Sequence, residues 1–233
     1  MAISLTQSVT GSISSAAGPL VLTLNGVASG ALLTVEFSYT QVGNLTAVAT
    51  PTDSGGTWVA ASAPAGQGSV DLTGAKIYYE QNAASGTHTA SIAFTGGTTD
   101  ARATLTEWAG ALTSTALDVA ASANATTAQT VTSGTTAATA QASELSVVAM
   151  CIASGVGVTD AVITNPPAGY TSLQYFGNTS TDIGVEHAYK ILNATGTQSV
   201  TWTWTDATTL FSQGVIATFK AAATDTLIGQ AVL

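Results

Sequence analysis

The chain has few charged residues, and this shortage excludes several classes of partner. Only 7% of its 233 residues are charged, against a usual share of about 25%. Four basic residues stand against thirteen acidic ones, which gives a formal net charge of −9. Because no basic stripe is available to neutralise phosphates, nucleic acid is not an expected partner. The 45% of hydrophobic residues is also too high for a disordered chain.

Cysteine and long apolar runs are scarce as well. Cys151 is the single cysteine, so no intramolecular disulfide can form, and its setting, SVVAMCIAS, indicates a buried strand more than a reactive thiolate. A membrane-spanning helix needs a run of about 18 apolar residues, and the chain contains no such run. We therefore expect no membrane partner. The opening MAISLTQSVTGS lacks the cationic flank and apolar stretch of a signal peptide. We therefore expect a protein that folds in a cytosol.

The chain is rich in short segments that alternate apolar residues with Thr or Ser. Clusters of Gly, Pro, Asn and Asp separate these segments, and no long stretch carries helical periodicity. We therefore predict an all-β, almost helix-free protein built as an antiparallel β-sandwich. The predicted strands are 3–9, 20–24, 32–39, 57–62, 75–79, 87–95, 103–108, 126–131, 145–153, 170–176, 184–191, 197–205 and 214–219.

Two stretches 110 residues apart are near copies of each other. YEQNAASGTHTASIAFT at 79–95 matches YKILNATGTQSVTWTWT at 189–205, and weaker echoes pair 31–37 with 143–149 and 104–110 with 215–221. In the strong match the aromatic and aliphatic residues share one face of their strand, so we predict that this face points inward. The inward residues are Ile92, Phe94, Trp202 and Trp204.

The repeat predicts the domain organisation. Residues 1–222 form an internally duplicated β-sandwich with halves of about 1–112 and 113–222, and residues 223–233 form a C-terminal arm. The two halves form either one fused sandwich or two tandem ones, and the fused form is favoured.

A set of short motifs carries a family resemblance. SGGTW, IYYEQNAASGTHTASIAF and LTEWAG, followed half a chain later by YKILNATGTQSVTWTW and GVIATFKA, resemble a duplicated β-sandwich module of phage virion proteins and bacterial surface proteins. The resemblance covers about residues 20–221. It implies a jelly-roll-like or immunoglobulin-like sandwich, displayed on a particle or cell surface, with no catalytic residues.

The resemblance also sets the expected function and partners. We expect a structural virion protein, first of all a bacteriophage capsid decoration (cement) protein, made in the host cytoplasm and located in the virion. It would bind the major capsid protein or another virion protein and form a homo-oligomer, with a trimer favoured by family analogy. The alternative is a carbohydrate-binding or adhesin-like surface module, so a glycan partner stays open.

The two histidines do not predict a catalytic site. His88 begins a strand directly after a turn, where we expect a position at the rim of the sandwich. His187 is expected on a strand with Glu186 on the opposite face, so the two cannot pair across one surface. No G-x-S-x-G nucleophile elbow occurs. We therefore predict that the protein is not an enzyme.

The carboxylates are open to more than one interpretation. Glu36, Glu80, Glu107 and Glu186 all lie on or beside predicted strands, and we interpret them as solvated side chains on strand faces. A facing pair of carboxylates, as in a glycoside hydrolase, is the alternative.

Cation and sugar sites are weakly indicated. Asp53 in TDSGGT and Asp182 in NTSTD could hold calcium in loops, but their spacing does not follow the EF-hand pattern, so no metal or cofactor is predicted. Several aromatic residues near loops could stack on sugar rings, although packing in the core or rim is preferred. They are Trp58, Tyr170, Tyr175 and Phe176.

The C-terminal sequence KAAATDTLIGQAVL predicts a contact surface. Leu227, Ile228, Val232 and Leu233 are too apolar to remain in water, yet they lie beyond the last predicted strand. We expect these residues to bind a partner, as a strand added to an exposed sheet edge on a neighbouring subunit or capsid. The alternative is that the arm packs back on its own sandwich.

Overall fold

The computed structural model is all-β and confirms the sequence-based prediction of an antiparallel β-sandwich. It describes residues 2–16, 18–42, 47–53, 56–61, 73–95, 98–125, 129–154, 162–163, 166–177, 183–205 and 210–223. Within these segments no helix is long and apolar enough to cross a membrane. The strands are β1 Ser4–Ala16, β2 Leu20–Val27, β3 Leu32–Val42, β4 Ala47–Val48, β5 Val59–Ala60, β6 Gly74–Glu80, β7 Gly86–Ile92, β8 Phe94–Thr95, β9 Thr98–Ala109, β10 Leu117–Ala125, β11 Thr130–Thr132, β12 Glu144–Ser154, β13 Val162–Ile163, β14 Thr171–Gly177, β15 Ile183–Ile191, β16 Thr201–Thr205 and β17 Leu210–Lys220.

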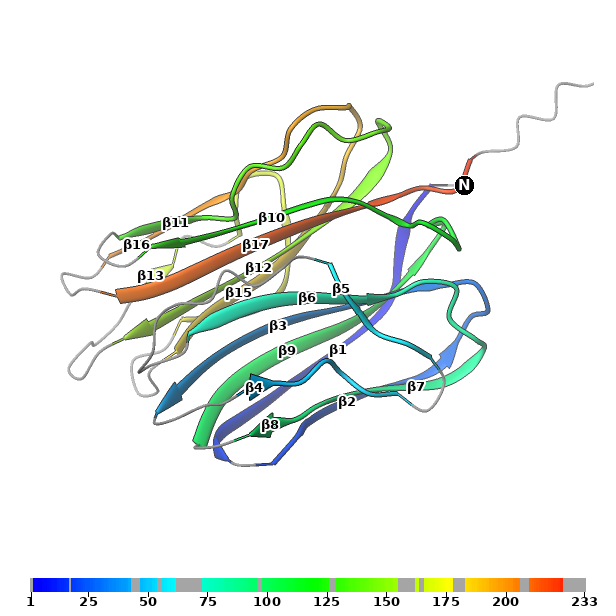
Figure 1. Ribbon diagram of the computed structural model, residues 1–233. Helices are drawn as coiled ribbons and strands as arrows, with labels where there is room; N and C mark the ends of the chain where they lie inside the picture. The colour runs from blue at the N-terminus through cyan, green and yellow to red at the C-terminus, as the bar shows by residue number, and fades with distance from the viewer. Residues whose placement is uncertain are drawn as a thin grey trace, which may run out of the picture.

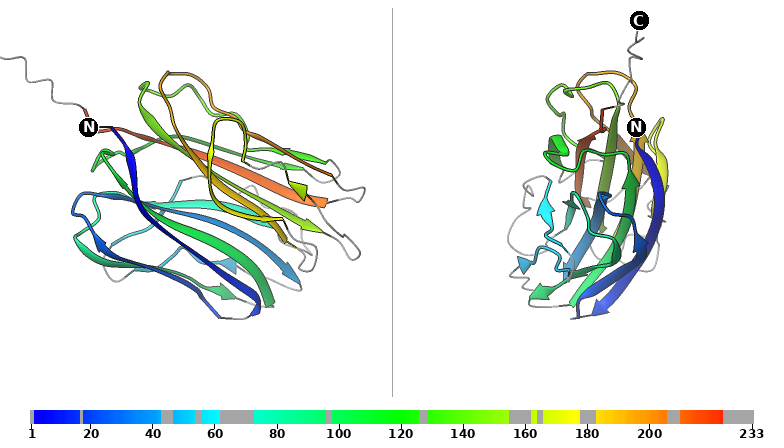
Figure 2. Two further views of the ribbon diagram at one scale, coloured as in Figure 1. Left: turned by 180° about the vertical axis from the view of Figure 1, so that it is seen from behind. Right: turned by 90° about the vertical axis from the view of Figure 1, so that its right-hand side faces the viewer.

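The strands stack in four layers (Figures 1 and 2). Two five-stranded sheets, with the orders β1-β9-β3-β6-β5 and β10-β17-β12-β15-β14, form the two central layers. The β2-β7 and β4-β8 pairs cover the outer face of the first sheet, and β11-β16-β13 covers the outer face of the second. The central strands of both large sheets are therefore covered on both faces, whereas β5 and β14 keep exposed residues.

Alternation along each strand assigns its residues to one of three hydrophobic cores. In β3, Leu32 belongs to the central core between the large sheets, whereas Leu33 belongs to the outer core beneath β2-β7. In β12, Leu145 and Val147 face the central core and Val148 faces the outer core beneath β11-β16. Because successive side chains point to opposite faces, one strand contributes to two cores at once.

The strand order repeats between the two halves of the chain. β1, β9, β3, β6 and β5 occupy the same positions in their sheet as β10, β17, β12, β15 and β14 do in theirs. The four residues that were predicted to point inward, Ile92, Phe94, Trp202 and Trp204, are all buried, which confirms the parity argument. Each half encloses an outer core of its own, and both halves share the central core.

Several strand boundaries differ from the sequence-based prediction. β10 was not predicted, because its sequence LDVAASANA consists mainly of small residues that are all half-buried and show no alternation. Pairing with β17 makes it a strand. The predicted strand 57–62 shrinks to β5, whereas 3–9 lengthens to β1. Cys151 lies buried in β12, as predicted.

The interpretation of the four glutamates as solvated is wrong. Glu36, Glu80, Glu107 and Glu186 do lie on strands, but their exposed fractions are only 0 to 4%. The physical reason is the second layer: a strand face that would be wet in a single open sheet is covered here by another sheet. The predicted partner-binding residues Leu227, Ile228, Val232 and Leu233 lie outside the described residues.

Candidate functional site

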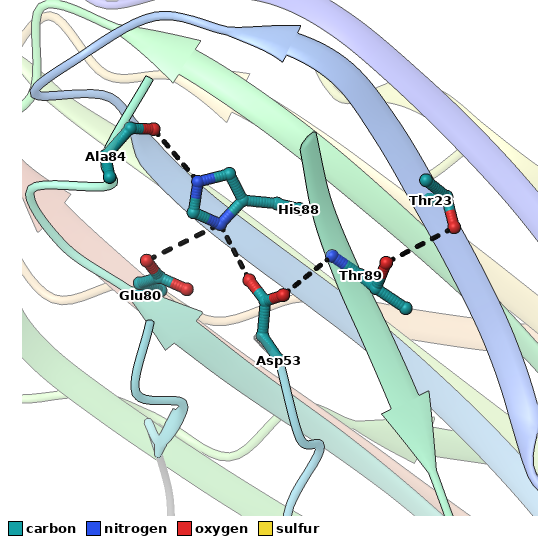
Figure 3. Close-up of polar contacts among 6 residues, drawn as sticks. All are labelled: Thr23, Asp53, Glu80, Ala84, His88 and Thr89. Carbon is teal, nitrogen blue, oxygen red and sulfur yellow. Dashed lines mark hydrogen bonds and ion pairs between the residues drawn. The ribbon is translucent and has the colours of Figure 1, made fainter. Parts of the chain in front are cut away.

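Three ionisable side chains from separate parts of the first half meet inside the protein (Figure 3). Asp53 directly follows an isolated bridge between Thr52 and Ser91, Glu80 ends β6, and His88 lies in β7. The side chains of Asp53 and His88 are 0% and 1% exposed. We name these three residues the acidic histidine cluster.

His88 is held at both ring nitrogens. Its Nδ1 lies 2.7 Å from Asp53 Oδ2 and 3.7 Å from Glu80 Oε1, and its Nε2 lies 2.9 Å from the carbonyl oxygen of Ala84. Burial by itself lowers the pKa of His88, but the Ala84 carbonyl, the Asp53 hydrogen bond and the Glu80 charge together raise it. The cluster thus favours a positive charge between its carboxylates.

The two carboxylates differ in how well they are partnered. Asp53 Oδ1 accepts a hydrogen bond from the backbone N–H of Thr89 at 3.0 Å, so both of its oxygens are engaged. Glu80 Oε2 is buried and has no hydrogen-bond partner among the described residues. Burial raises the pKa of Glu80, and the charge of Asp53 adds to this rise while His88 opposes it.

Gly56 allows the chain to pass closely over Glu80. A Cβ atom at position 56 would clash with the carboxylate of Glu80, so only glycine fits there without a shift. This glycine belongs to the TDSGGT segment, which also supplies Asp53. The pattern of turn residues was visible in the sequence, but its approach to Glu80 was not.

A hollow of about 380 Å³ borders the cluster on the Glu80 side. Asn82 adopts a left-handed backbone conformation with a φ of 59°, and Gln81 accepts a 2.9 Å hydrogen bond from the N–H of Ala116 through its side chain. The hollow is lined by Gly56, Thr57, Val59, Tyr79, Glu80, Gln81, Asn82 and Ala84.

The geometry does not suit His88 to general base catalysis. Both ring nitrogens already contact acceptors, so no lone pair is directed at a nucleophile among the described residues. His88 lies near the start of β7, and its side chain is buried there beside Asp53 and Glu80. Of the two residues that were considered as calcium ligands and not predicted to be so, Asp53 joins this cluster and Asp182 lies outside the described residues.

His187 occupies a different place, at the centre of the molecule. Its Nε2 lies 2.9 Å from Ser38 Oγ and its Nδ1 lies 3.0 Å from Thr104 Oγ1, so it connects the two large sheets. Burial lowers its pKa to about 3, and the ring is therefore neutral. Glu186 precedes His187 in β15, so its side chain points to the opposite face of the sheet. Burial there raises the pKa of Glu186 to about 8.

The aromatic residues near loops divide between core and surface. Trp58 is buried in the outer core of the first half. The hydroxyl of Tyr170 lies 2.9 Å from that of Ser146, and the guanidinium of Arg102 lies 4.2 Å from the ring centroid of Phe176. Tyr175 is exposed at 40%. These aromatic residues do not gather into one sugar-stacking platform.

Comparisons with protein-family models, curated proteins and solved structures give no match to this chain. The described residues form an all-β, four-layered molecule, and among them Asp53, Glu80 and His88 make up a cluster of carboxylate and imidazole side chains in the first half.

Proposed function

We propose that the protein is a structural assembly protein of the kind that decorates phage capsids, and that it acts by binding neighbouring subunits and a particle surface. The observation that carries the proposal is the scarcity of exposed charge among the described residues. Every charged side chain in the described segments is buried or half-buried. The surface of a typical soluble domain instead carries about 25–35% charged residues of both signs.

A neutral surface favours close packing between protein faces. Exposed charges keep proteins apart through mutual repulsion and through the cost of removing them from water on contact. Hydroxyl, amide and small apolar groups carry a smaller desolvation cost when two faces meet. The described part of the surface, where exposed charge is scarce, is therefore suited to a protein that packs against its neighbours.

β1 provides a specific contact edge. It is a thirteen-residue strand at the end of its sheet, and its sequence SLTQSVTGSISSA contains no charged residue and no proline. Edge strands of monomeric proteins are usually blunted by charge, proline or bulges. Irregularities in the pairing with β9 occur at Leu5/Gln7 and Ile13/Ala16, so residues 7–13 remain a regular edge. We propose that this edge pairs with a strand of a neighbouring subunit.

The proposed assembly is a homo-oligomer, with a trimer favoured, bound to the major capsid protein or another virion protein. The C-terminal residues Leu227, Ile228, Val232 and Leu233 remain proposed partner contacts alongside the β1 edge.

The test is a charge placed on the β1 edge. Thr10 is an exposed residue of β1, and Thr113 is an exposed residue of the connection between β9 and β10. We expect Thr10→Lys to lower the oligomer mass measured by light scattering and the occupancy on particles seen by electron microscopy. Thr113→Lys, with the same charge change, should alter neither. Unchanged assembly of a folded Thr10→Lys variant would rule out the β1 edge.

A carbohydrate-binding role is the second candidate, and the hollow beside Glu80 favours it. Tyr79 and Asn82 both line it, and ligand pockets commonly combine an aromatic residue with a few polar groups. A glycan array probed with the wild type and with Asn82→Ala tests this role. Binding that depends on Asn82 would support it over the assembly role.

A further inference from the structure

We propose that Asp53, Glu80 and His88 bind a divalent transition-metal ion, and that Zn²⁺ is the ion that fits best. Each residue offers one ligand atom, and these three atoms lie within 4.8 Å of one another. Carboxylate oxygens and imidazole nitrogens are ligands that zinc takes at about 2.0–2.2 Å. This site goes beyond the proposed assembly role and does not depend on it.

The distances between the ligand atoms suit a tetrahedral ion. Two ligand atoms bound tetrahedrally at about 2.0–2.1 Å lie roughly 3.3–3.4 Å apart. His88 Nδ1 lies 2.7 Å from Asp53 Oδ2 and 3.7 Å from Glu80 Oε1, which brackets that separation. All three ligand atoms lie within 4.8 Å of one another, so an ion that binds them would have to draw them closer together. The ion would replace the proton that lies between His88 and Asp53.

The surrounding contacts orient two of the ligands in advance. A metal-binding histidine usually donates its other ring N–H to a carbonyl or carboxylate, which fixes the tautomer and the ring orientation. His88 Nε2 donates to the Ala84 carbonyl at 2.9 Å, which leaves Nδ1 to coordinate. The second oxygen of Asp53 accepts from the Thr89 N–H at 3.0 Å.

The excess of carboxylates in the cluster is a second, independent indication of a bound cation. Glu80 Oε2 is buried and has no hydrogen-bond partner among the described residues, and two carboxylates here face one imidazole. With His88 neutral, the two charges of Zn²⁺ balance those of Asp53 and Glu80. Burying carboxylates without such compensation is costly.

The hollow beside Glu80 leaves room for a fourth ligand. Zinc sites with three protein ligands commonly complete their coordination with a water molecule. The ion would link the Asp53 segment to β6 and β7. Because it would bind only the folded chain, we expect it to raise the free energy of unfolding.

The experiment uses the full-length protein without an affinity tag, stripped with EDTA and desalted. Zn²⁺ is then titrated by calorimetry, and bound zinc is counted after equilibrium dialysis. We expect one zinc per chain, a higher melting temperature and the release of protons, since His88 must lose its Nδ1 proton to coordinate. Background binding should be low because the only other histidine and the only cysteine, His187 and Cys151, are buried.

Three variants decide whether the cluster is the site. Glu80→Gln and Asp53→Asn should each weaken zinc binding by about 100-fold or more, because loss of an outer contact alone costs about 10–100-fold. Asp118→Asn removes a carboxylate elsewhere and should bind as the wild type does. Circular dichroism and melting in EDTA establish that each variant is folded.

The proposal is overturned if the stripped wild type binds no zinc. It is also overturned if a folded Glu80→Gln variant binds zinc as tightly as Asp118→Asn does. Co²⁺ provides a second readout, because a tetrahedral site gives strong visible absorption that must disappear in Glu80→Gln. Failure of the wild type to form an oligomer or to bind particles, with zinc binding intact, would count against the assembly role alone.

Discussion

Trp108 of the first half packs edge-on against Tyr189 of the second, with ring centroids 4.9 Å apart and an interplanar angle of 63°. The contact occurs a second time with the halves exchanged: Phe219, the counterpart of Trp108, meets Tyr79, the counterpart of Tyr189, at 5.3 Å and 61°. Such reciprocity is characteristic of a twofold, isologous interface. The halves therefore pack within one chain as the two subunits of a homodimer pack together.

Removing one of these rings should destabilise the whole molecule. We expect Trp108→Ala to lower the free energy of unfolding by about 3–5 kcal/mol, since Trp108 is fully buried in the central core. A double-mutant cycle with Tyr189→Leu should show a coupling of about 0.5–1.5 kcal/mol for the ring pair. Urea unfolding measures both values, and strict additivity of the two changes would contradict a direct contact.

The two halves should not be independent of each other. Separated pieces covering residues 1–112 and 113–222 would each expose one side of the central core, which includes Leu32, Leu145 and Phe219. We expect each piece alone to aggregate or bind a hydrophobic dye, and the mixture to form a one-to-one complex with native near-ultraviolet circular dichroism. Two soluble pieces that unfold cooperatively by themselves would show that the central core is dispensable.

Trp202 should tolerate substitution by Phe much better than substitution by Ala. It is fully buried in the outer core of the second half, and its indole N–H has no hydrogen-bond partner among the described residues. Trp202→Ala should cost about 3–5 kcal/mol of stability. Trp202→Phe should cost less than half of that, because it keeps an aromatic ring and removes an unpaired donor. Thermal unfolding compares the two, and equal losses would argue against the packing described.

Glu36 should make the protein less stable as the pH rises. Burial raises its pKa from 4.5 to about 8, so between these values the unfolded chain is ionised while the folded chain keeps the proton. Its contribution to stability is full below pH 4.5 and is lost as the pH rises towards 8, at about 1.4 kcal/mol per pH unit. Glu36→Gln should reduce this slope by one proton in urea unfolding. Glu186→Gln should do the same, and an unchanged slope in both variants would refute the assignment.

His187 should make the protein less stable as the pH falls. Burial lowers its pKa from 6.5 to about 3, so below pH 6.5 the unfolded chain binds a proton that the folded chain refuses. Its contribution to stability is present above pH 6.5 and is lost as the pH falls towards 3. His187→Gln should flatten the acid side of the stability profile while lowering stability throughout, because Ser38 and Thr104 lose their partner. His88→Gln is the matched control, since the raised pKa of His88 predicts no such flattening.

The sequence by itself determined the fold class and the inward faces of the strands. The period-two alternation around Ile92 and Trp202 is a local property of the chain, so it could be identified before any strand pairing was known. The repeat of 110 residues likewise predicted two halves with matching strands. β10 could not be predicted in this way, because its small residues form a strand only through pairing with β17.

The tertiary structure alone decided the environment of the ionisable groups. Glu36 has the alternation of a solvated strand residue, and only the second large sheet, packed over the first, removes it from water. The cluster of Asp53, Glu80 and His88 likewise combines a loop, the end of one strand and the interior of another. No spacing along the chain encodes that meeting, because it depends on how the β2-β7 layer lies over the first sheet and on the close passage of Gly56 over Glu80. Local patterns predict which face of a strand is buried, whereas the partners found at that face are set by contacts between segments distant in sequence.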